Sequence, residues 1–169
     1  MKLKQTTSVA FSSLAAAAMV FSSLFIHIPI PGGFGFLNIC DAFIIAFSFY
    51  FSPVYSAGAA IAGGALSDFL LGYSAYVPAT VICKSIIALS VSLTARKKNT
   101  VIVSVSALVS GLIQSGLYFM YEFLILKYGA GAAVNIPYNI GQTVASLIIA
   151  VLIIKVINKT GLDKKIDRS

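Results

Sequence analysis

Residues 52–98 read SPVYSAGAAIAGGALSDFLLGYSAYVPATVICKSIIALSVSLTARKK and decide the fold of this chain. They hold two apolar segments of nearly membrane length, separated by a short turn that contains glycine and tyrosine. Ser52-Pro53 and Pro78 are typical of helix starts, with a capping serine and with proline in the first turn. The second segment ends at the basic cluster 96–98, as cytoplasmic membrane boundaries do. The stretch therefore predicts two consecutive membrane-spanning helices.

The whole chain has the composition of a membrane protein. Hydrophobic residues make up 59% of the 169 residues and charged residues 10%, whereas a soluble domain has about 25% charged residues. The mean hydropathy is +0.96. The net charge of +7 is concentrated at segment ends, so nucleic acid is not expected as a partner. The length suits one bundle, and we expect residues 1–169 to form a single transmembrane domain.

Six apolar segments are expected to cross the lipid bilayer, each close to the ~20 residues that a span requires. The proline- and glycine-rich stretch 27–36 ends the first segment. The second segment is short, and we expect it to be tilted or partial. We read the first segment as a retained helix because no cleavage site follows it. The expected segments are residues 7–26, 38–51, 52–71, 78–95, 101–126 and 137–157.

Basic residues in the short loops set the orientation of these segments. With six spans, the two termini and the loop between the fourth and fifth segments lie on one side, which is the basic side. The fold class is therefore an all-α membrane protein, a six-helix transmembrane bundle with both termini cytoplasmic. The residues that carry this bias are Lys2, Lys4, the cluster 96–98, Lys159, Lys164, Lys165 and Arg168.

Four charged residues fall inside the apolar segments, and all four are expected in the outer half of the bilayer. They are Asp41, Asp68, Lys84 and Glu122. A charge at the bilayer centre costs about 3 kcal/mol on insertion scales, so pairing, a water-filled cavity or a polar ligand must compensate each one. Two interpretations stay open: Lys84 pairs with Asp68 or Asp41 only to hold the bundle, or these groups bind a ligand.

Polar residues of five segments converge on the same outer layer, which predicts a pocket that faces outward. Structural pairs alone do not explain why they gather in one leaflet. The alternatives are that the tyrosines form an interfacial belt and that the amides link helices at about 0.6 kcal/mol each. No metal ligands and no cofactor are expected. The predicted binding residues are Asn38, Asp41, Tyr73, Tyr76, Lys84, Glu122, Asn139 and Gln142.

Small residues four positions apart mark two helix faces that permit close packing. On the third segment, Ala59 and Gly63, with their neighbours Ala60 and Gly64, are expected to pack within the bundle. On the first segment, a Ser/Ala face near the cytoplasm either packs internally or offers a flat face to a partner protein. The candidate docking residues are Ser12 with Ala16 and Ser13 with Ala17.

Catalytic motifs are missing from the sequence. It contains no His-Glu-x-x-His, no Gly-x-Ser-x-Gly and no phosphate-binding loop, so we expect no enzyme. A chain without a nucleotide site cannot use ATP to drive transport, and a partner or a gradient must supply the energy.

Three motifs resemble a known family. Asn38-x-x-Asp41-Ala42, the run 62–73 (AGGALSDFLLGY) and Tyr76-x-Pro78-Ala79-Thr80-x-x-x-Lys84 are similar to the substrate-binding S components of energy-coupling-factor (ECF) vitamin transporters. The most similar branch is the riboflavin-transporter-like group with hydroxymethylpyrimidine and pyridoxine proteins. In this family, a small-residue face on the first helix contacts the transmembrane T component.

The resemblance implies a multi-pass subunit of the prokaryotic cell membrane that captures a vitamin outside the cell. It implies partnership with a T component and two ATPases, and rotation in the membrane to release the cargo. Pyridoxine or hydroxymethylpyrimidine is favoured over riboflavin, and the absence of tryptophan argues against thiamine. The competing hypotheses are a self-sufficient small carrier or channel and a structural membrane subunit.

Overall fold

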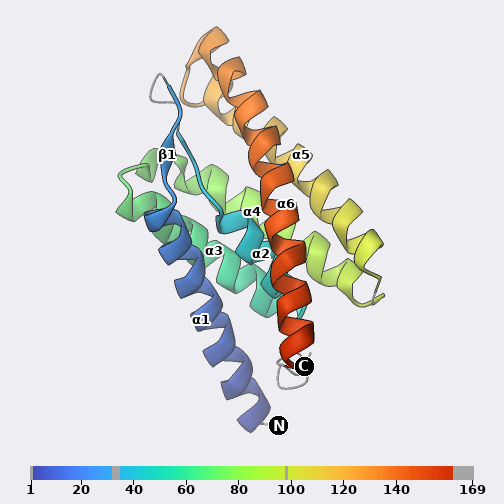
Figure 1. The fold of residues 1–169 in the computed structure, drawn as a ribbon. Coiled ribbons are helices and arrows are strands. Elements are labelled where there is room, and N and C mark those ends of the chain that lie inside the picture. The colour runs from blue at the N-terminus through green and yellow to red at the C-terminus, as the bar shows by residue number, and fades with distance from the viewer. Residues whose placement is uncertain (1, 32–34, 98, 162–169) are drawn as a thin grey trace.

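Six α-helices make up most of the described chain in the computed structural model, which describes residues 2–31, 35–97 and 99–161. A two-stranded hairpin and two short 3-10 helices connect them (Figure 1). In chain order the elements are α1 (Lys2–Phe25), β1 (Ile28–Pro29), β2 (Phe36–Leu37), α2 (Cys40–Ser48), α3 (Pro53–Leu70), η1 (Ser74–Tyr76), α4 (Val77–Ala95), α5 (Thr100–Leu124), η2 (Gly129–Val134) and α6 (Asn135–Thr160).

Proline and asparagine define the helix starts. Pro53 opens α3 and Pro78 lies in the first turn of α4, as predicted. Ser52 occupies the N-cap position of α3, but its side chain makes no capping hydrogen bond, so the prediction of a capping serine was wrong in this respect. The side chain of Asn99 does cap a helix: its Oδ1 accepts from the backbone N–H groups at the start of α5. This cap satisfies donors that have no partner within the helix.

The short helix α2 lies at the centre of the bundle. It packs against α6, α4, α1 and α3, and seven of its nine residues are buried. Nine residues span about 14 Å at 1.5 Å per residue, which is half of a ~30 Å hydrocarbon core. The surrounding helices therefore enclose α2, and it does not cross a membrane by itself, in keeping with the expectation of a partial segment.

Within the described residues, four segments are long and apolar enough to cross a membrane by length and composition. They are Thr6–Phe25, Ser74–Ala95, Thr100–Leu124 and Gly129–Thr160. The number of spans and the cytoplasmic position of the termini stay predictions. Of the basic residues that carry the orientation argument, Lys98, Lys164, Lys165 and Arg168 lie outside the described residues.

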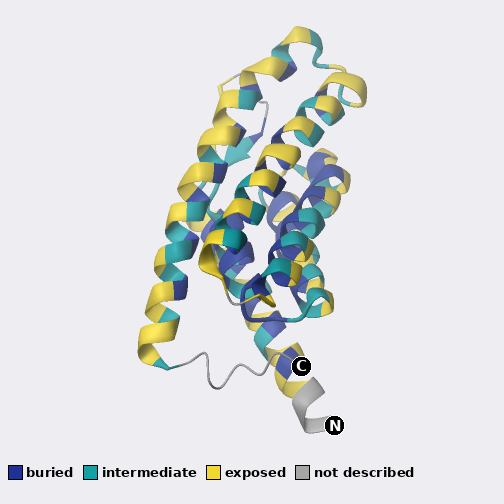
Figure 2. Cartoon of the chain, turned by 90° about the vertical axis from the view of Figure 1, so that its right-hand side faces the viewer, coloured by how far each residue is buried: buried dark blue, intermediate teal, exposed yellow. Residues whose placement is uncertain are grey.

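The outer faces of the helices are apolar, as a lipid environment requires. Large hydrophobic side chains such as Phe21 on α1, Leu112 on α5 and Ile148 on α6 are exposed. Figure 2 shows exposed positions along the outside of these helices and buried positions toward the centre. Since a soluble protein seldom exposes so much contiguous apolar surface, this pattern is typical of an all-α membrane protein.

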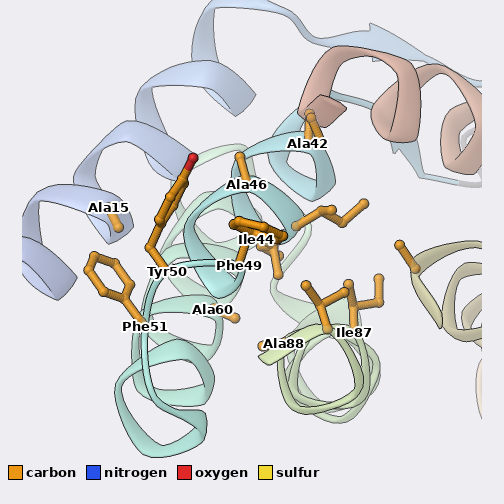
Figure 3. Close-up of a cluster of buried hydrophobic side chains, with 14 of the residues drawn as sticks. Ala15, Ala42, Ile44, Ala46, Phe49, Tyr50, Phe51, Ala60, Ile87 and Ala88 are labelled. Atoms are coloured by element: carbon orange, nitrogen blue, oxygen red, sulfur yellow. The ribbon is translucent and has the colours of Figure 1, made fainter. Parts of the chain in front are cut away.

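Small residues bring the helices close together around the apolar core. Alanines of α1, α2, α3 and α4 meet the aromatic rings at the end of α2 (Figure 3). A Cβ atom on Gly63 would lie 2.8 Å from Cβ of Met19 on α1, and one on Gly64 would lie 3.0 Å from Cγ of Lys84 on α4. The prediction that the small residues of α3 pack within the bundle is confirmed. Between α5 and α6, a Cβ atom on Gly111 would lie 2.2 Å from Cγ2 of Thr143.

The hairpin between α1 and α2 covers one end of the bundle. Its antiparallel strands pair Ile28 with Leu37 and Pro29 with Phe36. In Figure 1 the hairpin and η2 lie at one end, and the start of α1 and the end of α6 lie at the other. Gly35 enters β2 with φ +102°, a conformation that favours glycine, and a Cβ atom there would lie 3.7 Å from the ring of Tyr76. The hairpin therefore lies directly against residues that line the polar cavity described below.

Candidate functional site

A polar cavity lies beneath the hairpin, between α3, α4, α5 and α6. Its lining combines aromatic and aliphatic side chains with carboxylates, amides and an ammonium group. The lining residues are Ile30, Gly35, Phe36, Asn38, Asp68, Tyr76, Thr80, Lys84, Tyr118, Glu122, Asn135, Asn139 and Gln142.

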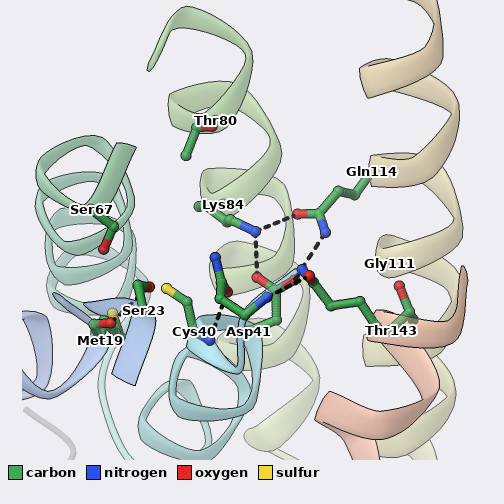
Figure 4. A network of polar contacts seen from close by, with 12 residues as sticks. Met19, Ser23, Cys40, Asp41, Ser67, Thr80, Lys84, Gly111, Gln114 and Thr143 are labelled. Atoms are coloured by element: carbon green, nitrogen blue, oxygen red, sulfur yellow. Dashed lines mark hydrogen bonds and ion pairs between the residues drawn. The ribbon is translucent and has the colours of Figure 1, made fainter. Parts of the chain in front are cut away.

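An ion pair with two amides forms the floor of the cavity (Figure 4). Nζ of Lys84 lies 2.6 Å from Oδ1 of Asp41 and donates a second hydrogen bond, 3.1 Å long, to Oε1 of Gln114. The other Asp41 oxygen accepts from Nε2 of Gln114 and from Nε2 of Gln142, both at 3.0 Å. Of the two pairings left open by the sequence, the structure therefore selects Asp41. The network joins α2, α4, α5 and α6, and the burial of its charges is compensated by pairing.

A second polar chain lies on the wall formed by α3, α4 and α5. Oγ1 of Thr80 donates to Oδ2 of Asp68 and lies 2.9 Å from the hydroxyl of Tyr118. Nζ of Lys84 lies 5.9 Å from the centre of the Tyr118 ring, within the range of a cation–π contact. The wall thus presents a carboxylate, two hydroxyls and an aromatic face to the cavity.

Glu122 on α5 and Asn135 on α6 meet at the cavity lining. Oε1 of Glu122 accepts from Nδ2 of Asn135 at 2.6 Å and from the hydroxyl of Tyr76 at 3.2 Å. Glu122 is 1% exposed, and its second oxygen, Oε2, has no hydrogen-bond partner among the described residues. A buried acceptor without a partner is costly, and here it lies in the lining of a cavity.

Two amides connect the cavity to the hairpin and to α2. The backbone N–H of Asn38 donates to Oε1 of Gln142 at 3.0 Å, and the side-chain oxygen of Asn38 accepts from the N–H of Cys40 at the start of α2. Asn139 lines the cavity on α6, and the described residues provide no hydrogen-bond partner for its carboxamide.

Six of the eight residues predicted to bind a ligand line this cavity: Asn38, Tyr76, Lys84, Glu122, Asn139 and Gln142. The other two do not. Asp41 lies beneath the lining, as the partner of Lys84. Tyr73 belongs to an aromatic cluster outside it, with its ring centre 4.7 Å from that of Phe36 and 5.9 Å from that of His27.

The sequence analysis missed Thr80, Tyr118 and Asn135 as binding residues. The sequence signal that could have identified these residues is their helical spacing. On α5, Gln114, Tyr118 and Glu122 follow each other at intervals of four, so they share one helix face. The same interval separates Asn135 from Asn139 on α6 and Thr80 from Lys84 on α4.

The two candidate docking pairs on α1 differ in exposure. Ser12 is buried, and its hydroxyl donates to the carbonyl of Ser8. Ala16 is half-buried, and its carbonyl oxygen lies close to Gly63. Ser13 and Ala17 are exposed. All four border an apolar groove between α1 and α3, together with Val9, Val20, Val54, Tyr55, Gly58, Ala59, Ala62 and Leu66.

A helical membrane bundle with a polar cavity at one end defines a membrane protein that binds a small solute. The sequence matches the family described as "ECF-type riboflavin transporter, S component" over residues 2–159, and the chain belongs to this family. It is also similar to an "Uncharacterized protein in gap 3'region" of Pyrococcus woesei, with 28% identity over 136 residues, 78% of this chain and 88% of that protein.

Membership in this family sets the general role of the chain. S components are the substrate-binding subunits of ECF importers, which work with a T component and ATPases to take up a small vitamin. The family is one of transporter components and not of enzymes. The chain is therefore a transmembrane protein of vitamin uptake and transport.

Proposed function

We propose that this protein captures a small water-soluble vitamin or vitamin precursor in the cavity beneath the hairpin. The observation that carries the proposal is the set of free polar groups on the cavity wall, at Glu122 and Asn139. A structural subunit has no need of such groups, because buried polar atoms are normally paired within the protein. We propose pyridoxine or hydroxymethylpyrimidine as the substrate, ahead of riboflavin.

Aromatic faces support a planar ring as the ligand. Tyr76 and Tyr118 both line the cavity, with ring centres 6.3 Å apart. Offset contacts between planar rings contribute about 0.5–1.5 kcal/mol beyond the burial of area. A heteroaromatic ring with hydroxyl or amine substituents suits this lining, because polar groups of α3 to α6 line the cavity around the two tyrosine rings.

Ligand binding by the purified chain in detergent tests the proposal. Isothermal titration with pyridoxine, hydroxymethylpyrimidine and riboflavin should give saturable binding for at least one compound. Asn139→Ala removes one amide and should weaken that binding by about 0.5–1.5 kcal/mol, the net value of a hydrogen bond. Gln142→Ala should weaken it further, because it also removes a donor to Asp41.

Tyr138→Ala is the matched control for these variants, since Tyr138 is adjacent on α6, is 37% exposed and does not line the cavity. Wild-type affinity in both Asn139→Ala and Gln142→Ala would show that the cavity is not the binding site. Saturable binding without transport in liposomes that contain only this chain would separate a capture subunit from a self-sufficient carrier.

We also propose that the T component docks on the groove between α1 and α3, through the exposed pair Ser13 and Ala17. Small side chains let a partner helix approach closely, and Gly58 on the other side of the groove has open space above it. Ala17→Trp should abolish vitamin uptake in cells that supply the T component and ATPases, and ligand binding by the isolated chain should persist. Ile148→Trp, at an exposed position of α6, is the control and should transport normally. Normal uptake by Ala17→Trp would exclude this docking surface.

A further inference from the structure

Glu122 provides a hydrogen-bond acceptor inside the cavity that the protein itself leaves unused. Tyr76 and Asn135 both donate to Oε1, at 3.2 and 2.6 Å, and they fix the orientation of the carboxylate. Oε2 is buried and has no hydrogen-bond partner among the described residues. Glu122 lines the cavity, so its carboxylate borders the space that a ligand would occupy. An ionised carboxylate oxygen accepts hydrogen bonds and donates none.

The charges around the cavity also favour a donor or a cation. The ammonium of Lys84 is neutralised by Asp41, 2.6 Å away. Asp68 receives the hydroxyl of Thr80, and neither Asp68 nor Glu122 has an ion-pair partner among the described residues. Together the three carboxylates of Asp41, Asp68 and Glu122 and the one ammonium of Lys84 carry a formal charge of −2. Because few water molecules reach a buried site, this imbalance favours ligands with positive or N–H-rich edges.

Asn139 adds a second recognition group close to the first. It lies one helical turn after Asn135, the residue that holds Oε1 of Glu122. Its carboxamide has no hydrogen-bond partner among the described residues, and it offers one acceptor and two N–H donors. An amine next to a ring nitrogen matches this combination, because the amine donates to a carboxylate while the ring nitrogen accepts from an amide.

We propose that Glu122 selects the substrate by accepting a hydrogen bond from an N–H group of a planar nitrogen heterocycle. The preferred ligand carries an exocyclic amine beside a ring nitrogen that accepts a hydrogen bond, or a cationic ring N–H group. An analogue with a carbonyl oxygen in place of that N–H group is rejected, because two acceptors then face each other in a buried site. This inference rests on the proposed function and specifies the substrate class of the same cavity.

The variant Glu122→Gln tests this inference directly, because the side chain of glutamine has almost the same size as that of glutamate. Its carboxamide oxygen must replace Oε1 and accept from Tyr76 and Asn135, so its NH₂ group then replaces Oε2. The cavity gains a donor where it had an acceptor. The preference between amine and carbonyl forms of one ligand should therefore reverse, whereas a purely structural role for Glu122 would change the affinity for both forms alike.

The probes are 4-amino-5-hydroxymethyl-2-methylpyrimidine and its 4-oxo counterpart, titrated by calorimetry into the full chain in detergent. Wild type should bind the amine form at least tenfold more tightly, and Glu122→Gln should bind the oxo form more tightly. Tyr138→Ala is the control, since Tyr138 lies on α6 outside the cavity lining. It should leave the order of preference unchanged. The thermal stability of ligand-free Glu122→Gln should equal or exceed that of wild type, since the unpaired buried charge at position 122 is removed.

The outcomes separate this inference from the proposed function. Equal binding of the two pyrimidines, tighter binding of the oxo form by wild type, or an unchanged preference in Glu122→Gln would overturn the role of Glu122. If neither pyrimidine binds but pyridoxine does, a tenfold loss of pyridoxine affinity in Glu122→Gln supports the inference, and an unchanged affinity overturns it. Binding of riboflavin alone overturns the inference and leaves vitamin capture intact, whereas failure of every vitamin to bind overturns both.

Discussion

Replacing Lys84 with methionine removes the only cation that compensates Asp41 within the described part of the chain. Asp41 then keeps two amide donors, Gln114 and Gln142, each at 3.0 Å, but loses the ammonium at 2.6 Å. Both partners of this ion pair are almost completely buried. Removing one partner of a buried pair typically costs 3–5 kcal/mol, about a hundredfold to several thousandfold in the folding equilibrium. We expect a loss of stability of this size.

The double variant Asp41→Asn with Lys84→Met provides the decisive comparison. Both charges are then absent, and Gln114 and Gln142 still have an amide to contact. Because replacing a whole buried pair by neutral groups is often close to neutral, the double variant should be more stable than either single variant. Equilibrium unfolding in mixed detergent micelles measures the four free energies of this cycle.

Two results would refute this reasoning. Wild-type stability of Lys84→Met would mean that the ammonium does not compensate Asp41. If the losses of Asp41→Asn and Lys84→Met simply added in the double variant, the two groups would be energetically independent, which is incompatible with a contact of this length.

Two further predictions concern helix packing and topology. Gly111→Ala should destabilise the bundle by about 1–3 kcal/mol, the usual cost of overpacking, because its Cβ would lie 2.2 Å from a methyl carbon of α6. Gly116→Ala on the same helix has open space around it and should be neutral or stabilising by thermal unfolding, so equal losses in both variants would argue against this helix contact. For topology, an impermeant thiol reagent added outside cells should label a cysteine placed at Gly131 and miss one placed at Asn99. The reverse pattern would invert the orientation of the bundle.

Much of the helical framework could be predicted from local sequence. Long apolar segments and the prolines at positions 53 and 78 indicate helices without any knowledge of tertiary contacts. Proline acts through backbone geometry, and a long apolar segment acts through its favourable transfer to lipid. Asn99 is a local signal that was not used to predict a helix cap. It is a strong N-cap residue directly before an apolar run, and its position predicts the cap that the structure contains.

The cavity lining was partly predictable for a related reason. Polar residues are expensive in apolar segments, so Lys84, Glu122 and Asn139 stand out in the sequence before any contact is known. Tyr118 does not stand out, since tyrosine is common at membrane boundaries. Its place in the cavity follows only from the i, i+4 spacing to Glu122 together with the direction that α5 faces.

The sequence by itself determined the membrane class, the apolar segments and the positions of the charges within them, because these depend on composition and on spacing along one helix. Only the tertiary structure decided that Asp41, and not Asp68, pairs with Lys84. It also decided that α2 is enclosed by the other helices and that Oε2 of Glu122 lies in the cavity lining without a partner. These facts depend on distances between residues 30 to 100 positions apart, which helix packing fixes and no local pattern encodes.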